Sequence, residues 1–321
     1  MAQRKTKLSI LSIILIACLT TFILNYTDGS SVADPPNIEI TSSNTRPLKT
    51  TVKAEEITTA PTDISDPKAI LAGTGMQNGQ VIITHRPDWK FDGNLIAQLE
   101  KLKIAAANGD IEANYVLAMN LRYCYYSPAD DIALEKKLEQ AYEFSDNELA
   151  VANITKRYKY CSGIEQRQRN QFYSYSEAAA SNGYVAAQEV IGSITPELFM
   201  ESQGYENLER DEFIIMRDNF IEQKIGFLEQ AAQNGSIRAL IRLSHMNRSQ
   251  NYGENGYVKS FAFNQLILEL TQSNKTYNKY SRYQQRMHPQ LTTEEIDNAF
   301  AMSEEWLEII RTNGTLYLNG N

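Results

Sequence analysis

One short pattern constrains this chain of 321 residues more than any other feature: Ala-Ala-x-Asn-Gly-x-x-x-Ala occurs three times. The copies begin at Ala105, Ala179 and Ala231. Internal self-similarity of this kind is typical of proteins built from stacked structural repeats, and it argues against a single globular core. Because such arrays mostly present surfaces to partners, the pattern favours binding over catalysis.

Each copy indicates a helix, a tight turn and a second helix. The glycine follows an apolar run and reaches positive φ without a Cβ clash, as a helix C-cap requires. Asp110 and Ser236 follow two of the glycines and are good N-caps, whereas Tyr184 in the middle copy is a poor one. The alanines allow close helix approach, and we expect the residue eight positions after each glycine to fill the seam. These residues are Leu117, Ile191 and Leu243.

The spacing of the copies predicts a fourth, degenerate one. Gly109 and Gly183 are 74 residues apart, twice 37, so a further copy is expected around residue 146. There Asp146 replaces the glycine, while Ala150 and Ile154 hold the alanine and apolar positions. The alternative is chance recurrence in an ordinary helical protein, and the matched apolar positions argue against it.

These residues resemble the Sel-one-like repeat family, a relative of the tetratricopeptide repeats, over roughly residues 94–313. The resemblance implies an all-α fold, an α-solenoid of about four to five helix-turn-helix repeats with a C-terminal capping helix. It also implies an adaptor or scaffold role. The chain departs from the family pattern because the glycine-containing loop that closes a unit is missing after Cys124 and Ile191.

Apolar periodicity and capping residues predict the individual helices. The expected ranges are 94–108, 111–123, 132–144, 147–160, 166–182, 185–193, 211–233, 237–246, 258–273 and 276–287. About 15 residues are inserted between the second and third copies, and we place this insertion at 196–207. A capping box formed by Thr292 and Glu295 starts a last helix, with Trp306 and Ile309 expected to cover the final apolar face.

The N-terminus indicates export. Arg4, Lys5 and Lys7 precede an uncharged apolar run of 17 residues, 8–24, which is about 25 Å long as a helix. We favour an uncleaved signal anchor in the inner membrane, with the body in the periplasm. Two alternatives stay open: a periplasmic lipoprotein whose lipid is carried by Cys18 in a Leu-Ile-Ala-Cys sequence, and secretion after cleavage.

The rest of the chain divides into a linker and a folded domain. Residues 25–87 are rich in Ser, Thr, Pro and Asp, and Asp-Pro steps interrupt any helix, so we expect a flexible tether. Within it, we expect 81–84 either to form a short strand or to dock on the body. The predicted domains are therefore a signal segment at 1–24, a linker at 25–87 and a helical repeat domain at 88–321.

The positions of the cysteines favour a disulfide. Cys124 and Cys161 are the only cysteines outside the leader, and they occupy equivalent positions 37 residues apart. Stacked units place equivalent residues about 10 Å apart, so a bridge requires the loops to bend. In an oxidising compartment we favour a disulfide; the alternative is two buried free thiols.

Chemistry-bearing motifs are scarce, so we predict no catalytic, cofactor or metal site. His85, His245 and His288 form no metal-ligand pattern, and no G-x-S-x-G sequence is present. Paired carboxylates of a glycosidase cannot be found from spacing, so an enzyme acting on the cell wall or carbohydrate remains an alternative, as does a structural envelope spacer. The net charge of −8 argues against nucleic acid as a partner and permits a basic protein.

Tyrosine is abundant, with 18 residues. Tyr125, Tyr126 and Tyr173 flank predicted loops and are the candidate partner-binding residues, because tyrosine is enriched in binding hot spots. Tyr123 and Tyr160 are better explained by packing between repeats. The leading hypothesis is a membrane-tethered extracytoplasmic module for protein–protein interaction, such as an immunity protein that binds an envelope toxin or an assembly factor.

Overall fold

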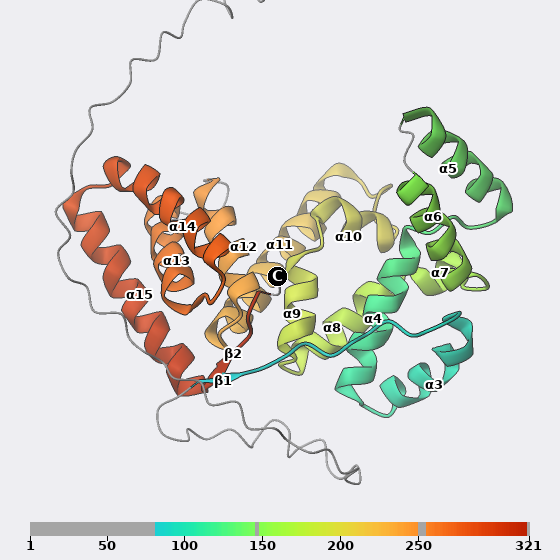
Figure 1. Cartoon of the computed structure of the whole chain (residues 1–321), viewed down its shortest axis with the longest axis horizontal. Coiled ribbons are helices and arrows are strands. Elements are labelled where there is room, and N and C mark those ends of the chain that lie inside the picture. Colours follow the sequence, from blue (N-terminus) through green and yellow to red (C-terminus); the bar gives the residue numbers. More distant parts are fainter. Residues whose placement is uncertain (1–80, 145–147, 250–254, 320–321) are drawn as a thin grey trace, which may run out of the picture. The chain divides into compact units, whose positions relative to one another are not determined.

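The computed structural model describes residues 81–144, 148–249 and 255–319, and this part of the chain is all-helical apart from two short strands (Figure 1). The predicted signal segment, Cys18, most of the predicted linker and Asp146 lie outside the described residues. The first helices are α3 (Ile96–Ala107), α4 (Ile111–Tyr125), α5 (Asp131–Phe144), α6 (Glu148–Cys161), α7 (Gln166–Arg169), α8 (Phe172–Ser181), α9 (Val185–Gly192) and α10 (Pro196–Ser202). They are followed by α11 (Arg210–Gln233), α12 (Ile237–Arg248), α13 (Gly256–Leu270), α14 (Asn274–Met287), the 3-10 turn η1 (His288–Gln290) and α15 (Thr293–Asn313).

The turn chemistry predicted for the three copies is confirmed. Their glycines have φ values of 89°, 80° and 75° at Gly109, Gly183 and Gly235. The Asp110 side chain accepts a hydrogen bond from the Ala113 amide, and Ser236 caps α12 in the same way, whereas Tyr184 provides no side-chain cap. The glycines therefore separate α3 from α4, α8 from α9, and α11 from α12.

The seam residues are also where the pattern places them. The exposed fractions of Leu117, Ile191 and Leu243 are 0%, 0% and 1%. Each lies in the second helix of its hairpin, eight residues after the glycine, and each hairpin packs as a pair. Burial of a leucine or isoleucine side chain stabilises a fold by roughly 1.5–3 kcal/mol, so these three positions anchor the hairpins.

Two helical segments differ from the prediction. The single helix expected over 166–182 is broken at Asn170 and Gln171, because Arg169 is buried and donates hydrogen bonds to the backbone oxygens of Ile164 and Ser127. The insertion at 196–207 contains a short helix, α10, which Thr195 caps through its side chain. Pro196 stands at the first position of that helix, where its missing N–H costs nothing.

The degenerate copy forms a hairpin, but the hairpin is not inserted in the stack. Helix α8 packs directly on α4, and the later contacts run from α9 to α11, from α12 to α13 and from α13 to α15. The pair α5–α6 contacts α4 through α6, and it leaves Ile132 and Leu149 exposed by 80% and 68%. The expectation that this unit stacks on its neighbours is wrong. It has Tyr142 and Glu143 where the other copies have the alanine pair that allows close helix approach.

A disulfide joins Cys124 near the end of α4 to Cys161 at the end of α6, with a Cα–Cα distance of 5.4 Å. Both cysteines are fully buried. The pairing is the predicted one, although its setting is different. The bridge does not tie two stacked units; it closes the base of the laterally placed α5–α6 hairpin.

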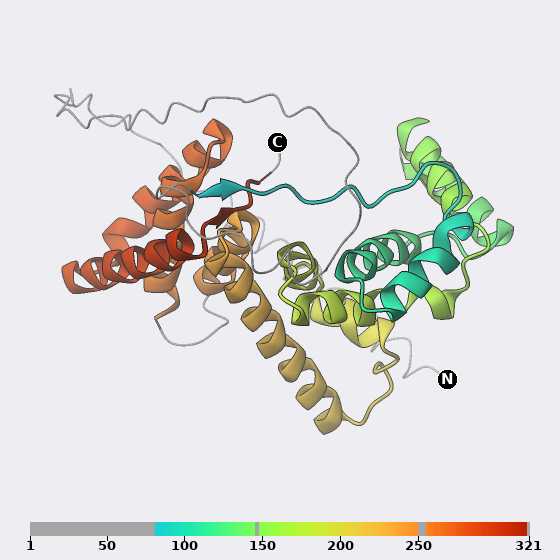
Figure 2. The ribbon, with the colours of Figure 1, turned by 90° about the horizontal axis from the view of Figure 1, so that it is seen from below.

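The two ends of the helical region meet in a small parallel sheet. Strand β1 (Ile82–Ile83) pairs with β2 (Thr315–Leu316), with Ile82 opposite Thr315. From β1 the chain runs extended to α3, as Figures 1 and 2 show. The short strand expected at 81–84 is therefore present, and the chain joins the helical region before residue 87, where the predicted linker ended.

The last helix has the predicted capping box. The side chain of Thr292 accepts a hydrogen bond from the Glu295 amide, and the Glu295 carboxylate accepts one from the Thr292 amide. Trp306 packs edge-on against Phe263 of α13, with ring centroids 5.2 Å apart. Helix α15 thus covers an apolar face of α13, as a terminal helix of a repeat array does.

Candidate functional site

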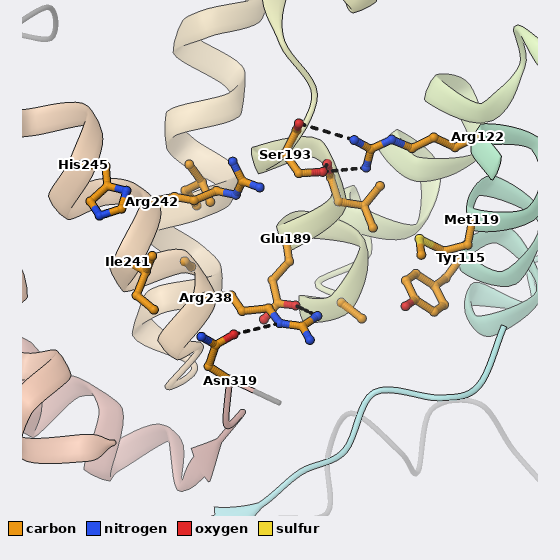
Figure 3. Close-up of a pocket in the computed structure, with 14 residues that line it drawn as sticks. Tyr115, Met119, Arg122, Glu189, Ser193, Arg238, Ile241, Arg242, His245 and Asn319 are labelled. Atoms are coloured by element: carbon orange, nitrogen blue, oxygen red, sulfur yellow. Dashed lines mark hydrogen bonds and ion pairs between the residues drawn. The ribbon is translucent and has the colours of Figure 1, made fainter. Parts of the chain in front are cut away.

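The second helices of the three hairpins, α4, α9 and α12, share the lining of a cavity of about 500 Å³ (Figure 3). The same helical face points into it in each copy. The residues six and ten positions after the turn glycine all line the cavity: Tyr115 and Met119, Glu189 and Ser193, and Ile241 and His245. Arg122, Arg238, Arg242 and Asn319 complete its polar lining.

Glu189 is the carboxylate of this cavity, and its interactions are already made within the protein. The side chain is 7% exposed and accepts two hydrogen bonds of 2.5 Å from the Nε and Nη2 atoms of Arg86. Ser236, the N-cap of α12, donates a third. Arg86 also donates to the backbone oxygen of Leu318, at 2.6 Å. This network holds together the N-terminal segment, α9, α12 and the C-terminal segment.

The arginines that line the cavity make fewer hydrogen bonds and ion pairs than Glu189 does. Arg122 donates to the hydroxyl and carbonyl oxygens of Ser193, at 2.5 and 3.4 Å. Arg238 lies 3.9 Å from Glu189 and donates to Asn319 at 3.3 Å. Arg242 makes no hydrogen bond or ion pair with any residue in the described ranges. One side of the cavity therefore presents guanidinium groups to solvent.

These cations lie close enough to act on one another. Burial lowers the pKa of Lys224 to about 8, and the charges of Arg242 and Arg122 lower it further against the opposing effect of Glu197. Burial also lowers the pKa of Arg122, where Arg242 acts in the same direction. The pKa of Arg242 is lowered mainly by desolvation, which Glu189 opposes. A negative charge placed among these groups would be stabilised.

His245 adds no positive charge at neutral pH. Its Nε2 atom lies 2.9 Å from the hydroxyl oxygen of the buried Tyr280. Burial lowers the pKa of His245 to about 4, and the positive charges of Arg248, Lys279 and Arg242 lower it further. The imidazole is therefore neutral at pH 7, and the charge of the lining comes from three arginines and Glu189.

The three candidate tyrosines have different environments. Tyr173 is only 5% exposed and packs in the core, with its ring 4.8 Å from Phe199 and 5.9 Å from Phe220. The prediction that Tyr173 lies at the surface is therefore wrong, because its ring packs among buried aromatic side chains. Its role in partner binding stays a prediction. Tyr125 is partly buried against Phe172, and burial raises its pKa, as does a hydrogen bond to Glu201. Tyr126 is 45% exposed.

Tyr123 and Tyr160 pack against each other edge to face at 5.7 Å, which confirms the packing interpretation. Lys90 and Arg157 lie over the Tyr123 ring, at 4.0 and 4.7 Å from its centroid. A second cavity of about 850 Å³ lies beside this cluster, between residues 90–94 and α6. None of the predicted tyrosines lines the cavity between α4, α9 and α12.

Across 81–144, 148–249 and 255–319, no group of three or more His, Cys, Asp or Glu side chains is arranged to hold a metal ion. Among the residues lining the α4–α9–α12 cavity, Glu189 is the one carboxylate, so they do not provide the pair that a glycosidase needs. In the same ranges, no helix combines the length and apolar character needed to cross a membrane.

Comparison of the chain with family models, curated proteins and solved structures found no match. The cavity residues themselves were not among those predicted from sequence. A signal for them is nevertheless present: positions six and ten after each glycine lie on one helical face, on the side away from the seam residue at position eight. Aligning the three copies by their glycines brings these positions into register.

Proposed function

We propose that this chain is a protein-binding module of the Sel-one-like repeat type, an α-solenoid that binds a segment of a partner. The segment occupies the cavity lined by α4, α9 and α12, which we call the groove. The observation that carries the proposal is the shared register of the cavity. Three copies of one hairpin turn the same two positions of their second helices toward a single cavity. Arrays of this type commonly use such a surface for recognition.

The residue types at these positions support recognition as their role. The seam position is a buried leucine or isoleucine in all three copies. The groove positions instead change from tyrosine and methionine to glutamate and serine, and then to isoleucine and histidine. Packing restricts the seam to one kind of side chain, whereas a binding surface gains specificity from different side chains in each repeat.

We further propose that the module works outside the cytoplasm, tethered to the inner membrane by residues 8–24 or by a lipid on Cys18. The basis is the charged and apolar leader sequence. The disulfide between Cys124 and Cys161 agrees with an oxidising compartment. In this setting an adaptor, an assembly factor or an immunity protein that binds an envelope toxin would all use the same groove.

Site-specific photocrosslinking in the cells that make this protein tests the binding role. A photoreactive phenylalanine analogue is placed in the groove at Met119 or Ile241, and in separate variants on exposed helix faces at Ile104 or Ile215, which are 62% and 58% exposed. We expect a discrete protein adduct from the groove positions and none from the outer ones. Adducts from the outer positions alone would contradict the proposal.

A blocking variant then connects the adduct to the cavity. Met119→Trp adds bulk to the groove from a partly buried position, and Ile104→Trp adds it to an exposed face of α3. We expect Met119→Trp to weaken binding of the purified partner by about tenfold or more, corresponding to about 1.4 kcal/mol, with Ile104→Trp unchanged. Equal affinities for both variants would place the interaction elsewhere.

A further inference from the structure

The groove has a local charge opposite to that of the chain. The chain carries a net charge of −8. The cavity lining nevertheless contains Arg122, Arg238 and Arg242, and its one carboxylate, Glu189, is bound by Arg86 and Ser236. Lys224 lies close to the same arginines. An excess of positive charge is therefore concentrated on one concave surface.

Two of these arginines approach the cavity from different helices. Figure 3 shows Arg122 extending from α4 and Arg242 extending from α12 toward the space beside Ser193. Ser193 binds Arg122, whereas Arg242 has no hydrogen-bonding partner in the described part of the chain. Each guanidinium group offers parallel N–H donors, so a planar carboxylate placed in this space is a suitable acceptor for both.

We propose that the groove recognises an acidic segment of the partner protein, with one of its carboxylates bound between Arg122 and Arg242. The inference rests on the protein-binding function proposed above. Met119 and Ile241 flank the arginines and suit the methylene groups of a glutamate or an adjacent apolar side chain. A cavity of about 500 Å³ accommodates one or two side chains.

An acidic protein segment fits this surface better than a long polyanion. Nucleic acids gain affinity from many phosphate contacts spread along a basic surface. Here the positive charge is local, and the remainder of the acidic chain would repel an extended polyanion. A short segment places a few carboxylates in the groove and leaves the rest of the partner free to avoid the negative surface.

A peptide selection tests the inference directly. The purified full-length protein is used to select from a library of random 12-residue peptides, and fluorescein-labelled copies of the selected peptides are titrated by fluorescence anisotropy. We expect enrichment in Asp and Glu, and affinities that fall as NaCl is raised from 50 to 500 mM, because screening weakens the ion pairs. We expect Arg242→Glu to select peptides enriched in Lys and Arg instead.

A matched pair of variants separates the groove from overall charge. Arg122→Gln with Arg242→Gln removes two charges from the cavity, and Arg210→Gln with Arg282→Gln removes two from exposed positions on α11 and α14. The first pair is expected to weaken peptide binding by about tenfold or more, since charge-assisted bonds are lost, and the second by less than about twofold. Thermal unfolding checks that the variants are folded. If Arg122→Gln destabilises the protein, peptide binding is compared between the unmodified protein and the single variant Arg242→Gln.

The outcomes distinguish this inference from the proposed function. Selected peptides without acidic enrichment, but still sensitive to Met119→Trp, would overturn the acidic preference and leave protein binding intact. Binding of a single-stranded oligonucleotide in preference to the acidic peptides would also overturn it. A library that yields no groove-dependent peptide would count against both.

Discussion

Gly235 and Gly183 hold the same place in two repeats but face different surroundings. Both have positive φ, 75° and 80°, which an L-amino acid side chain adopts only at a cost. A Cβ atom added at Gly183 would meet nothing within 4 Å. At Gly235 it would lie 2.2 Å from the backbone oxygen of Thr315, where β2 crosses the turn. In the last copy, the glycine is therefore required both by its positive φ and by the close approach of the Thr315 backbone.

We predict that Gly235→Ala destabilises the protein more than Gly183→Ala. Both changes force alanine into the left-handed region, at about 1–2 kcal/mol. Gly235→Ala also displaces the C-terminal strand, and such overpacking costs about 1–3 kcal/mol more. Urea unfolding of the two variants measures the difference. Equal losses would show that β2 does not press on this turn.

His245 gives a pH-dependent contribution to stability. Its pKa is lowered to about 4 by burial and by neighbouring cations, whereas an unfolded histidine titrates near 6.5. Below pH 6.5 the unfolded chain takes up a proton that the folded chain does not, so stability falls as the pH drops from about 6.5 to 4 and does not depend on this residue above that window.

The variant His245→Gln should remove this dependence while keeping a polar group near Tyr280. We expect the loss of melting temperature between pH 6.5 and 4 to be smaller in the variant than in the unmodified protein by about a few degrees. The carboxylates of both proteins titrate in the same pH range. The contribution of His245 is therefore the difference between the two melting-temperature curves. Parallel curves would mean that His245 is not held neutral.

At the scale of elements, the sequence predicts helices and turns well because the determinants are local. Asp110, Ser236 and Thr292 cap the helices that their positions indicate, and the seam residues are buried. The lateral position of α5–α6 could not be predicted from spacing, since a period of 37 residues fixes where a hairpin occurs and not what it packs on. The break before α8 likewise depends on the long-range contacts of Arg169.

The disulfide fixes this lateral hairpin, and we predict that its loss acts locally. Replacing Cys124 and Cys161 by alanine should lower the free energy of unfolding by about 4 kcal/mol, given their separation of 37 residues. Amide hydrogen exchange should accelerate in α5 and α6 and remain slow in α8 and α9, which pack on other helices.

Alkylation of the unreduced protein checks the bridge itself. Mass spectrometry should find both cysteines protected without reductant and both labelled after reduction. Labelling of both cysteines in the unreduced protein would contradict the disulfide. Faster exchange throughout α8 and α9 in the alanine variant would instead show that the bridge supports the whole stack.

At the scale of the whole molecule, Glu189 joins segments that are far apart in sequence. It binds Arg86, which lies 103 residues earlier, and Arg86 in turn binds the backbone oxygen of Leu318. The side chains of Arg86 and Glu189 are 14% and 7% exposed. Such a pairing is invisible to local pattern reading, because each residue alone resembles an ordinary surface charge.

We predict strong coupling in a double-mutant cycle of Arg86→Gln and Glu189→Gln. Each single change leaves a mostly buried charge without its partner and should cost about 3 kcal/mol, whereas the double change should cost less than the sum. The exposed pair of Lys103 and Glu100 serves as a control, with an expected effect below about 1 kcal/mol. Additive losses at Arg86 and Glu189 would contradict the network.

The distribution of charge also emerges only at this scale. The net charge of −8 led us to expect that a basic protein would be tolerated as a partner. The folded groove instead gathers arginines from α4 and α12, which lie more than a hundred residues apart in sequence. The net charge of the chain therefore did not predict the positive charge of the groove.

Hydrogen–deuterium exchange of the full-length protein, alone and with the partner recovered by crosslinking, tests the central claim most directly. The groove account predicts that binding slows amide exchange in α4, α9 and α12, and that Arg242→Gln reduces this protection. Protection confined to α5 and α6, or to the residues around the second cavity, with α4, α9 and α12 unchanged, would contradict it.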